Sequence, residues 1–315
     1  MQERRPALTD EERGHLSSTP RHTAAKVASA CTLLVTALLG LSVGARGTLD
    51  ADLMEATVKI EGRKRDSLGC IGTGFFVGLP VEGKKHDTMA VVLLVTARHV
   101  FDSIGEDSAN IIMRMRLSDG SFRKQQERVE IRRKGIPVWT SHPNADVDVA
   151  VLSPELYAYK IEPPAFAQIG YLATDKELRF WSLGPGDAVR CLGYPLGAEG
   201  EQAGFPILRG GLIASYPILP SLQHPLVQCD FEIYEGNSGG PVYMVESYRP
   251  DSNNNIYKGN PVQMILGLVS VQYWSSPNVR PKSEIKLGGY VPAAFIQETI
   301  DRYLRDSRIK AVPLH

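Results

Sequence analysis

A turn of small residues in this 315-residue chain reads Gly236-Asn237-Ser238-Gly239-Gly240-Pro241. Nucleophilic acyl transfer needs an exposed hydroxyl and, beside it, backbone N–H groups that can stabilise an oxyanion. Glycines let the backbone turn sharply and approach a substrate carbonyl without Cβ clashes. Ser238 is therefore the candidate nucleophile, and the N–H groups of Gly236 and Ser238 are the candidate oxyanion-hole donors. Because a simple hairpin uses the same residue types, the rest of the chain must decide between the two interpretations.

A serine hydroxyl needs a neighbouring base to take its proton. The candidate base is His99, which follows the apolar run 91–96. An imidazole in this role needs an acid that fixes its tautomer and stabilises its cation. We select Asp148 as this acid because it directly precedes the apolar run 149–152, where burial limits exposure. Asp146 is the local rival, two residues earlier and on the same face of a strand.

The chain is strand-like from about residue 53 onward, with short runs of Val, Ile, Leu and aromatic residues between Gly, Pro, Asn and Asp. The expected strands include 56–60, 74–77, 91–96, 110–115, 147–152, 188–193, 211–214, 242–245 and 264–271. Helical periodicity is clear only over residues 293–305, which predicts a short C-terminal amphipathic helix. Many short strands separated by turn signals predict an all-β sandwich or barrel.

Several segments together resemble the trypsin-like (chymotrypsin-fold) serine peptidases, and most closely their bacterial HtrA-type branch. The segment Thr96-Ala97-Arg98-His99 is similar to the T-A-x-H motif of that branch, and residues 148–152 are similar to its D-[IV]-A-[LV]-L strand. Residues 228–241, QCDFEIYEGNSGGP, align without a gap with Q-T-D-A-A-I-x-x-G-N-S-G-G-P. Shorter matches follow in the same order at residues 72–75, 192–197 and 289–292.

The resemblance implies a pair of six-stranded antiparallel β-barrels, with His99 and Asp148 from the first and Ser238 from the second. It implies an endopeptidase that works through an acyl-enzyme on protein or peptide substrates without a cofactor. The order of the triad excludes the α/β-hydrolases, whose nucleophile elbow also fits Gly236-x-Ser238-x-Gly240 but whose order is Ser, acid, His. After Ser238 the only histidine is His315.

Some family features are missing from the sequence. Asn237 stands where the digestive enzymes have an aspartate that binds a newly cut N-terminus, and no I-V-G-G-like start precedes Ala56. We therefore expect the order of the oxyanion hole to come from elsewhere in the chain. HtrA-type proteins usually carry PDZ domains, but only ten residues follow Arg305, so no such domain is expected here.

The resemblance also implies a primary specificity pocket formed by two segments. Its expected wall residues are Ile233, Tyr234, Glu235, Ser270, Val271 and Gln272. Val271 and Gln272 would narrow the pocket, so we expect a small or medium apolar P1 residue. The alternative function is a catalytically silent protein-binding module of the same fold, with its cleft blocked by loop 247–261 or loop 275–289. The presence of all three triad residues favours the peptidase.

The first fifty residues predict export. Residues 27–45 carry no charge, follow a polar segment that contains Arg21 and Lys26, and end in small residues. This is the order of a secretory signal, and Val43-x-Ala45 is a passable cleavage site. The same 19 residues can span a bilayer. We expect a periplasmic or secreted protein, with residues 27–45 either cleaved or kept as a membrane anchor.

The remaining organisation is expected to be a first barrel over 51–160, a connector over 161–178, a second barrel with the C-terminal helix over 179–305, and a tail over 306–315. Thirty-five basic and 35 acidic residues give no overall field that would attract nucleic acid. The basic run 114–134 is expected to be a solvated strand-and-loop face. No oligomeric state is predicted.

Four cysteines are too few for a disulfide scaffold in a chain of this length. Cys31 lies in the export segment, and no CxxC or Cys/His cluster indicates a metal site. The resemblance suggests a bridge between Cys191 and Cys229. The alternative is three separate buried thiols at Cys70, Cys191 and Cys229.

Overall fold

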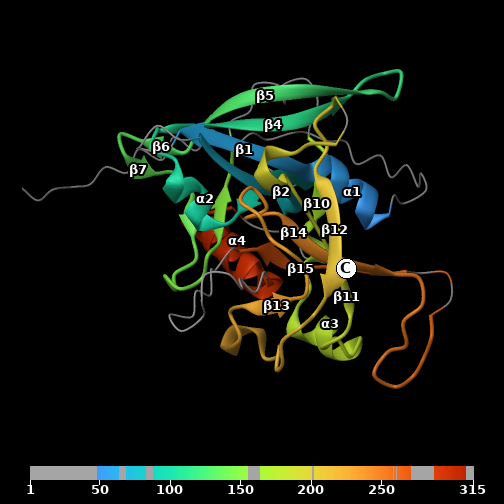
Figure 1. Ribbon diagram of the computed structural model, residues 1–315. Helices are drawn as coiled ribbons and strands as arrows, with labels where there is room; N and C mark the ends of the chain where they lie inside the picture. Colours follow the sequence, from blue (N-terminus) through green and yellow to red (C-terminus); the bar gives the residue numbers. More distant parts are fainter. Residues whose placement is uncertain are drawn as a thin grey trace, which may run out of the picture. The chain divides into compact units, whose positions relative to one another are not determined.

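The computed structural model describes residues 48–63, 69–82, 88–154, 164–200, 202–257, 259, 261–270 and 287–309. Two curled β-sheets make up most of this part of the chain (Figure 1). The first sheet contains β1 (Thr57–Arg63), β2 (Gly69–Glu82), β3 (Thr88–Thr96), β4 (Ser108–Arg116), β5 (Phe122–Glu130), β8 (Thr140–Ser141), β9 (Ala150–Leu152) and β10 (Ala167–Gln168). The second contains β11 (Ala188–Gly193), β12 (Ile207–Leu212), β13 (Val227–Cys229), β14 (Pro241–Glu246), β15 (Val262–Val269) and β16 (Gly288–Pro292). The all-β prediction is confirmed.

The first sheet has the strand order β5-β4-β1-β2-β3-β9-β8, with β10 parallel to β2. It therefore has eight strands in the described residues, where the family resemblance implied six. The difference lies in very short strands, because β8 and β10 are two residues each. Strand β10 lies within the segment expected to be a connector, and its pairing with Val77 and Gly78 ties that segment to the first sheet. A separate two-stranded ribbon joins β6 (Arg132–Arg133) to β7 (Ile136–Pro137).

The second sheet has the order β12-β11-β14-β15-β16-β13, and all its pairs are antiparallel. Its six strands match the number that the resemblance implied. Apolar residues of β11, β14 and β15 form the centre of a second hydrophobic core. The turn that contains Ser238 directly precedes β14, so this core holds one end of the turn.

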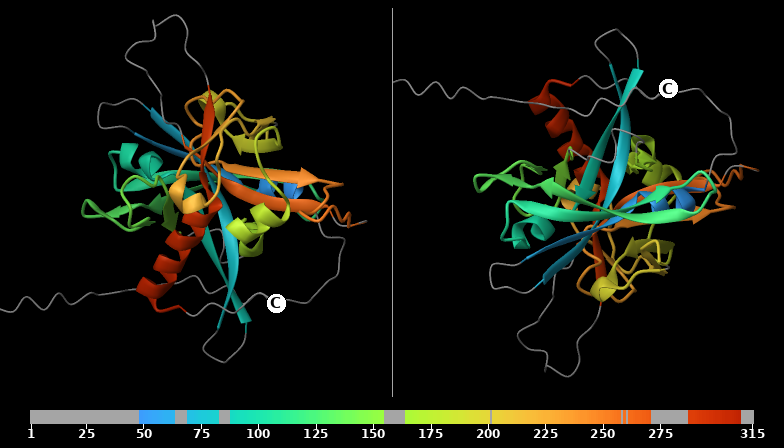
Figure 2. Two further views of the ribbon diagram at one scale, coloured as in Figure 1. Left: turned by 90° about the horizontal axis from the view of Figure 1, so that it is seen from below. Right: turned by 90° about the horizontal axis from the view of Figure 1, so that it is seen from above.

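Four α-helices accompany the sheets in the described residues: α1 (Leu49–Ala56), α2 (Arg98–Ser103), α3 (Asp175–Phe180) and α4 (Ala293–Ser307). Helix α4 confirms the predicted C-terminal helix, since Phe295, Ile296, Ile300 and Leu304 are buried along one face. They join the core of the first sheet, and Figure 2 shows α4, in red, beside the cyan strands of that sheet in both views. None of these helices is long and apolar enough to cross a membrane, and residues 27–45 lie outside the described residues.

The basic residues of the run 114–134 are exposed or half-buried, as predicted, except Arg114. Strand β5 is mostly exposed or half-buried, as expected of a solvated face. Arg114, however, is only 7% exposed. Its guanidinium donates to the Tyr194 hydroxyl and the Gly204 carbonyl at 2.7 Å each. The prediction is wrong for Arg114, because local composition does not reveal these partners 80 and 90 residues away.

Candidate active site

His99 and Asp148 lie in direct contact. Strand β3 ends at Thr96, and His99 is the second residue of helix α2, which follows after a single residue. The His99 ring nitrogen Nδ1 lies 2.6 Å from Asp148 Oδ2, and the His99 backbone N–H donates to Asp148 Oδ1 at 3.0 Å. An ionised carboxylate only accepts hydrogen bonds, so Nδ1 carries a proton and a neutral ring keeps Nε2 as its acceptor nitrogen.

Asp148 is held in its ionised form. The side chain is 13% exposed, and burial by itself would raise the pKa of the carboxyl group. Hydrogen bonds from His99 and Ser270, together with the attraction of the His99 ring, outweigh burial and lower the pKa of Asp148. The His99 side chain is 40% exposed, so the imidazole remains reachable from solvent while its orienting carboxylate is shielded.

Asp146, the rival acid, is exposed. Its backbone N–H donates to Asn144 Oδ1 at 3.0 Å. The geometry therefore brings Asp148, and not Asp146, to His99.

The turn around Ser238 is fixed through its carbonyl groups. Four consecutive carbonyls accept hydrogen bonds: Glu235 from Leu196 N–H (2.7 Å), Gly236 from Thr73 Oγ1 (2.6 Å), Asn237 from Gly240 N–H (3.0 Å) and Ser238 from Thr73 N–H (2.8 Å). The N–H groups of Gly236 and Ser238 have no acceptor among the described residues. A trans peptide points its N–H away from its C=O, so the paired carbonyls of Glu235 and Asn237 fix the direction of both amides.

Glycine is required at two positions of this turn. Gly236 has φ +98° and Gly239 has φ +86°, which side chains rarely tolerate. A Cβ at Gly236 would lie 2.1 Å from the Tyr194 carbonyl oxygen, and one at Gly239 would lie 2.2 Å from the Thr73 carbonyl oxygen. At Gly239 the turn thus approaches β2 of the first sheet as closely as only glycine allows, and at Gly236 it approaches Tyr194, which follows β11 of the second sheet.

Gly239, the residue after Ser238, lies close to the end of the strand that leads to His99. Gly239 packs against Thr96 and Ala97, just before His99, and its N–H donates to the Val269 carbonyl at 2.7 Å. In the part of the chain that the structure describes, Ser238 Oγ makes no hydrogen bond to His99. Such bonds are often long before substrate binds. Ser238 is 5% exposed.

The expected pocket residues divide into three groups. Ile233 is half-buried and packs against the second core, and Tyr234 and Glu235 lead into the turn. Ser270 has a contact that sequence reasoning missed, because its hydroxyl donates to Asp148 Oδ2 at 2.7 Å. The position of Ser270 just after an apolar strand did not predict this bond, because Ser270 and Asp148 are 122 residues apart in the sequence. Val271 and Gln272 lie outside the described residues.

Cys191 and Cys229 are free and buried, so the bridge suggested by the resemblance is absent. Burial raises the pKa of the Cys191 thiol to about 12, so this residue behaves as a small apolar side chain. No group of potential metal-binding side chains is found among the described residues.

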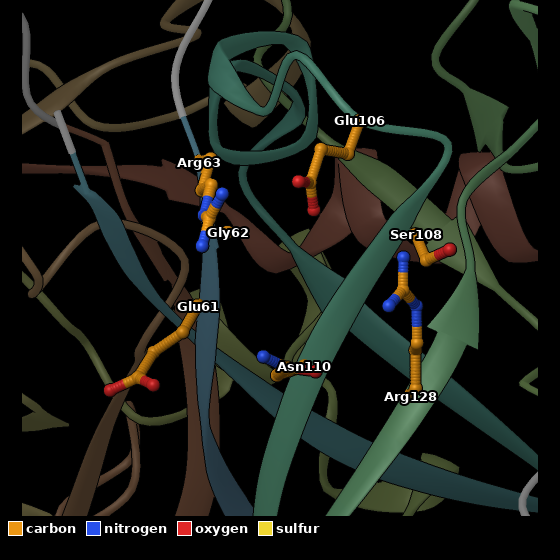
Figure 3. A pocket seen from close by; sticks show the side chains of 7 residues that line it. All are labelled: Glu61, Gly62, Arg63, Glu106, Ser108, Asn110 and Arg128. Carbon is orange, nitrogen blue, oxygen red and sulfur yellow. The ribbon is translucent and has the colours of Figure 1, made fainter. Parts of the chain in front are cut away.

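A polar hollow of about 410 Å³ lies on the first sheet. Figure 3 shows its lining, formed by Glu61, Gly62, Arg63, Glu106, Ser108, Asn110 and Arg128. None of the triad or pocket residues lines it, so this hollow is separate from the candidate active site.

A family model agrees with this fold. The chain matches the family described as Trypsin-like peptidase domain over residues 72–247, which is more than half of its length. A search of curated proteins gave no match.

Three of the solved structures that are similar to this chain are the following. The MamO protease domain from Magnetospirillum magneticum is 15% identical, with 79% of this chain and 97% of that chain covered and a TM-score of 0.42. Deg5 is 18% identical, with 81% and 90% covered and a TM-score of 0.45. The Rv3671c protease from M. tuberculosis is 17% identical, with 84% and 86% covered and a TM-score of 0.42.

Proposed function

The chain belongs to the trypsin-like peptidases, and we propose that it is an exported serine endopeptidase in which Ser238, His99 and Asp148 form the catalytic triad. A serine peptidase of this family acts on protein or peptide substrates. The observation that carries the mechanism is that the amides of Gly236 and Ser238 have no acceptor among the described residues, in a turn where the carbonyls of residues 235–238 all accept hydrogen bonds.

In the proposed mechanism, Ser238 Oγ attacks the peptide carbonyl carbon while His99 Nε2 accepts the hydroxyl proton. Asp148 holds the ring through Nδ1 and stabilises the imidazolium. The amides of Gly236 and Ser238 stabilise the oxyanion. His99 then gives its proton to the leaving amine, which breaks the C–N bond and leaves an acyl-enzyme. Water, deprotonated by His99, attacks this ester. His99 then returns the proton to Ser238 Oγ as the acyl C–O bond breaks and the acid leaves.

For the primary pocket we propose a small or medium apolar P1 residue. A Cβ at Gly288 of β16 would lie 2.9 Å from Ile233 Cδ1 and 2.6 Å from a ring carbon of Phe231. These two side chains therefore fill the space over Gly288, beside the expected pocket residue Ile233. A peptide-library cleavage profile tests this proposal, and a preference for basic or large aromatic P1 residues would contradict it.

Export is proposed from the sequence, through the uncharged residues 27–45 after a charged segment. N-terminal sequencing of the mature protein tests whether these residues are cleaved or kept as an anchor. A mature protein that begins at Met1 in the cytosolic fraction would contradict export.

Labelling with a fluorophosphonate probe tests the nucleophile. We expect the wild type to label, and Ser238→Ala to lose labelling and at least about 10⁴-fold in peptidase activity. Ser221→Ala is the matched control, since Ser221 is also a buried serine but lies outside the proposed site. A folded, export-processed wild type that does not label would favour the alternative, a catalytically silent protein-binding module.

A further inference from the structure

We propose that Thr73, on β2 of the first sheet, is a positioning residue that holds the oxyanion-binding turn of the second sheet in its active geometry. The proposal rests on the proposed peptidase function. Thr73 contacts neither Ser238 Oγ nor the two unpaired amides in the described structure, so it would act through the turn and not on the substrate.

Thr73 binds the turn at two points. Its N–H donates to the Ser238 carbonyl at 2.8 Å, and its Oγ1 donates to the Gly236 carbonyl at 2.6 Å. These carbonyls flank Asn237. Thr73 is fully buried, so water does not compete for either bond. One residue of the first sheet thus fixes the carbonyls on both sides of Asn237, the residue between the two proposed oxyanion donors.

The same hydroxyl also orders the neighbouring turn. Thr73 Oγ1 accepts a hydrogen bond from Tyr194 N–H at 3.3 Å. Two residues later, Leu196 N–H donates to the Glu235 carbonyl and so sets the plane of the Glu235–Gly236 peptide. Loss of the hydroxyl would therefore remove the bond to the Gly236 carbonyl. It would also remove the bond to Tyr194, which supports the Leu196 contact with the Glu235 carbonyl.

Thr73 also joins the turn to the strand that leads to His99. Thr96 Oγ1 donates to the Thr73 carbonyl at 2.6 Å, and Thr96 lies three residues before His99. The N–H, the hydroxyl and the carbonyl of Thr73 thus all bind elements of the proposed site. The position of the Ser238 turn relative to the segment that carries His99 therefore depends on Thr73.

The side chain of Asn237 does not provide this anchor. It is 1% exposed, and its Oδ1 has no hydrogen-bond partner in the described structure. The amide at this position cannot attract a charged N-terminus as a carboxylate would. The contacts of the turn across to the first sheet are therefore made by backbone carbonyls, and Thr73 supplies two of the four donors.

Thr73→Val tests the proposal because valine keeps the β-branched shape and removes only the hydroxyl. We expect kcat on a fluorogenic peptide with valine at P1 to fall about 10- to 100-fold, less than the roughly 10²- to 10³-fold loss on removal of a complete oxyanion donor. KM should change less than about twofold, since ground-state binding does not use the oxyanion hole. Affinity for the matching peptide aldehyde, whose adduct places an oxyanion in the hole, should fall with kcat. Thr73→Ser keeps the hydroxyl, so it should retain the wild-type kcat and aldehyde affinity.

Thr299→Val is the matched control. Thr299 is also fully buried and donates from Oγ1 to a backbone carbonyl, that of Phe295, at 2.7 Å, but it lies in α4. We expect it to lower the Tm as Thr73→Val does and to leave kcat unchanged. If Thr73→Val fails to fold, Thr73→Ala removes the same hydroxyl with less crowding and takes its place.

Two outcomes would overturn the proposal in distinguishable ways. If the wild type labels with fluorophosphonate at Ser238 and Thr73→Val keeps its kcat and aldehyde affinity, the role of Thr73 is wrong while the peptidase function stands. If the wild type does not label, the peptidase function fails and the role of Thr73 fails with it. Equal kcat losses in Thr73→Val and Thr299→Val would show a general loss of stability and would also overturn the role.

Discussion

The His99–Asp148 pair and the Ser238 turn come from different sheets and are fixed by different kinds of contact. The pair depends on side-chain atoms, since both Asp148 oxygens bind His99 and Ser270 adds a third bond. The turn depends on its backbone, through four paired carbonyls and two glycines at positive φ. We therefore expect the activity to be lost when a functional group of the His99–Asp148 pair is replaced by one of the same shape. In the Ser238 turn, we expect it to be lost when atoms are added or when the partners of the turn in the first sheet are changed.

The largest effect is expected from a substitution that disrupts the His99–Asp148 pair and leaves the Ser238 turn intact. Asp148→Asn keeps the shape of the side chain but stabilises the wrong tautomer of His99, so we expect kcat to fall by roughly 10⁴-fold. The rate of peptide hydrolysis measures this effect. Asp146→Asn is the control, and it should retain wild-type kcat because Asp146 is exposed and makes no contact with His99. A larger loss in Asp146→Asn would reverse the assignment of the acid.

A smaller effect is expected when the turn is broken and the pair is left intact. Gly236→Ala places a Cβ against the Tyr194 carbonyl and should lower kcat by roughly 10²- to 10³-fold through loss of one oxyanion donor. Gly120→Ala separates this clash from backbone strain, because Gly120 also has positive φ (+83°) but has no heavy atom within 4 Å of its Cβ position. Gly120→Ala should cost about 1–2 kcal/mol in the free energy of unfolding and retain full activity. Unchanged kcat in a folded Gly236→Ala protein would remove Gly236 from the proposed oxyanion hole.

The smallest expected effect concerns the pH dependence of stability. The pKa of Asp148 is lowered in the folded protein, so its ionised form stabilises the fold fully above the ordinary aspartate pKa of about 3.9. This contribution is lost as the pH falls through the lower folded pKa. The difference in unfolding free energy between the wild type and Asp148→Asn should therefore be constant near neutral pH and shrink below about pH 4. Urea unfolding from pH 7 to pH 3 measures this difference, and an increase on acidification would contradict the lowered pKa.

Local patterns predicted much of the fold. Short apolar runs identified β3, β4, β11, β14 and β15 to within a few residues, because a buried strand needs apolar residues that are neighbours in the sequence. The helix α4 was predicted from its apolar spacing in the same way. The helices α1, α2 and α3 were not predicted because six to eight residues carry too little periodicity. Strand β5 was not predicted because its solvated residues form no apolar run.

The residue types of the proposed chemistry could be predicted from local sequence: a serine in a glycine-rich turn, a histidine after an apolar run and an aspartate before one. Only the tertiary structure decided that Asp148 faces His99, that Ser270 supports Asp148, that Arg114 is buried and that Thr73 holds the Ser238 turn. The physical reason is separation along the chain. Strand and turn preferences act between neighbours, whereas the Thr73 hydroxyl and the Gly236 carbonyl are 163 residues apart and meet only when the two sheets pack together.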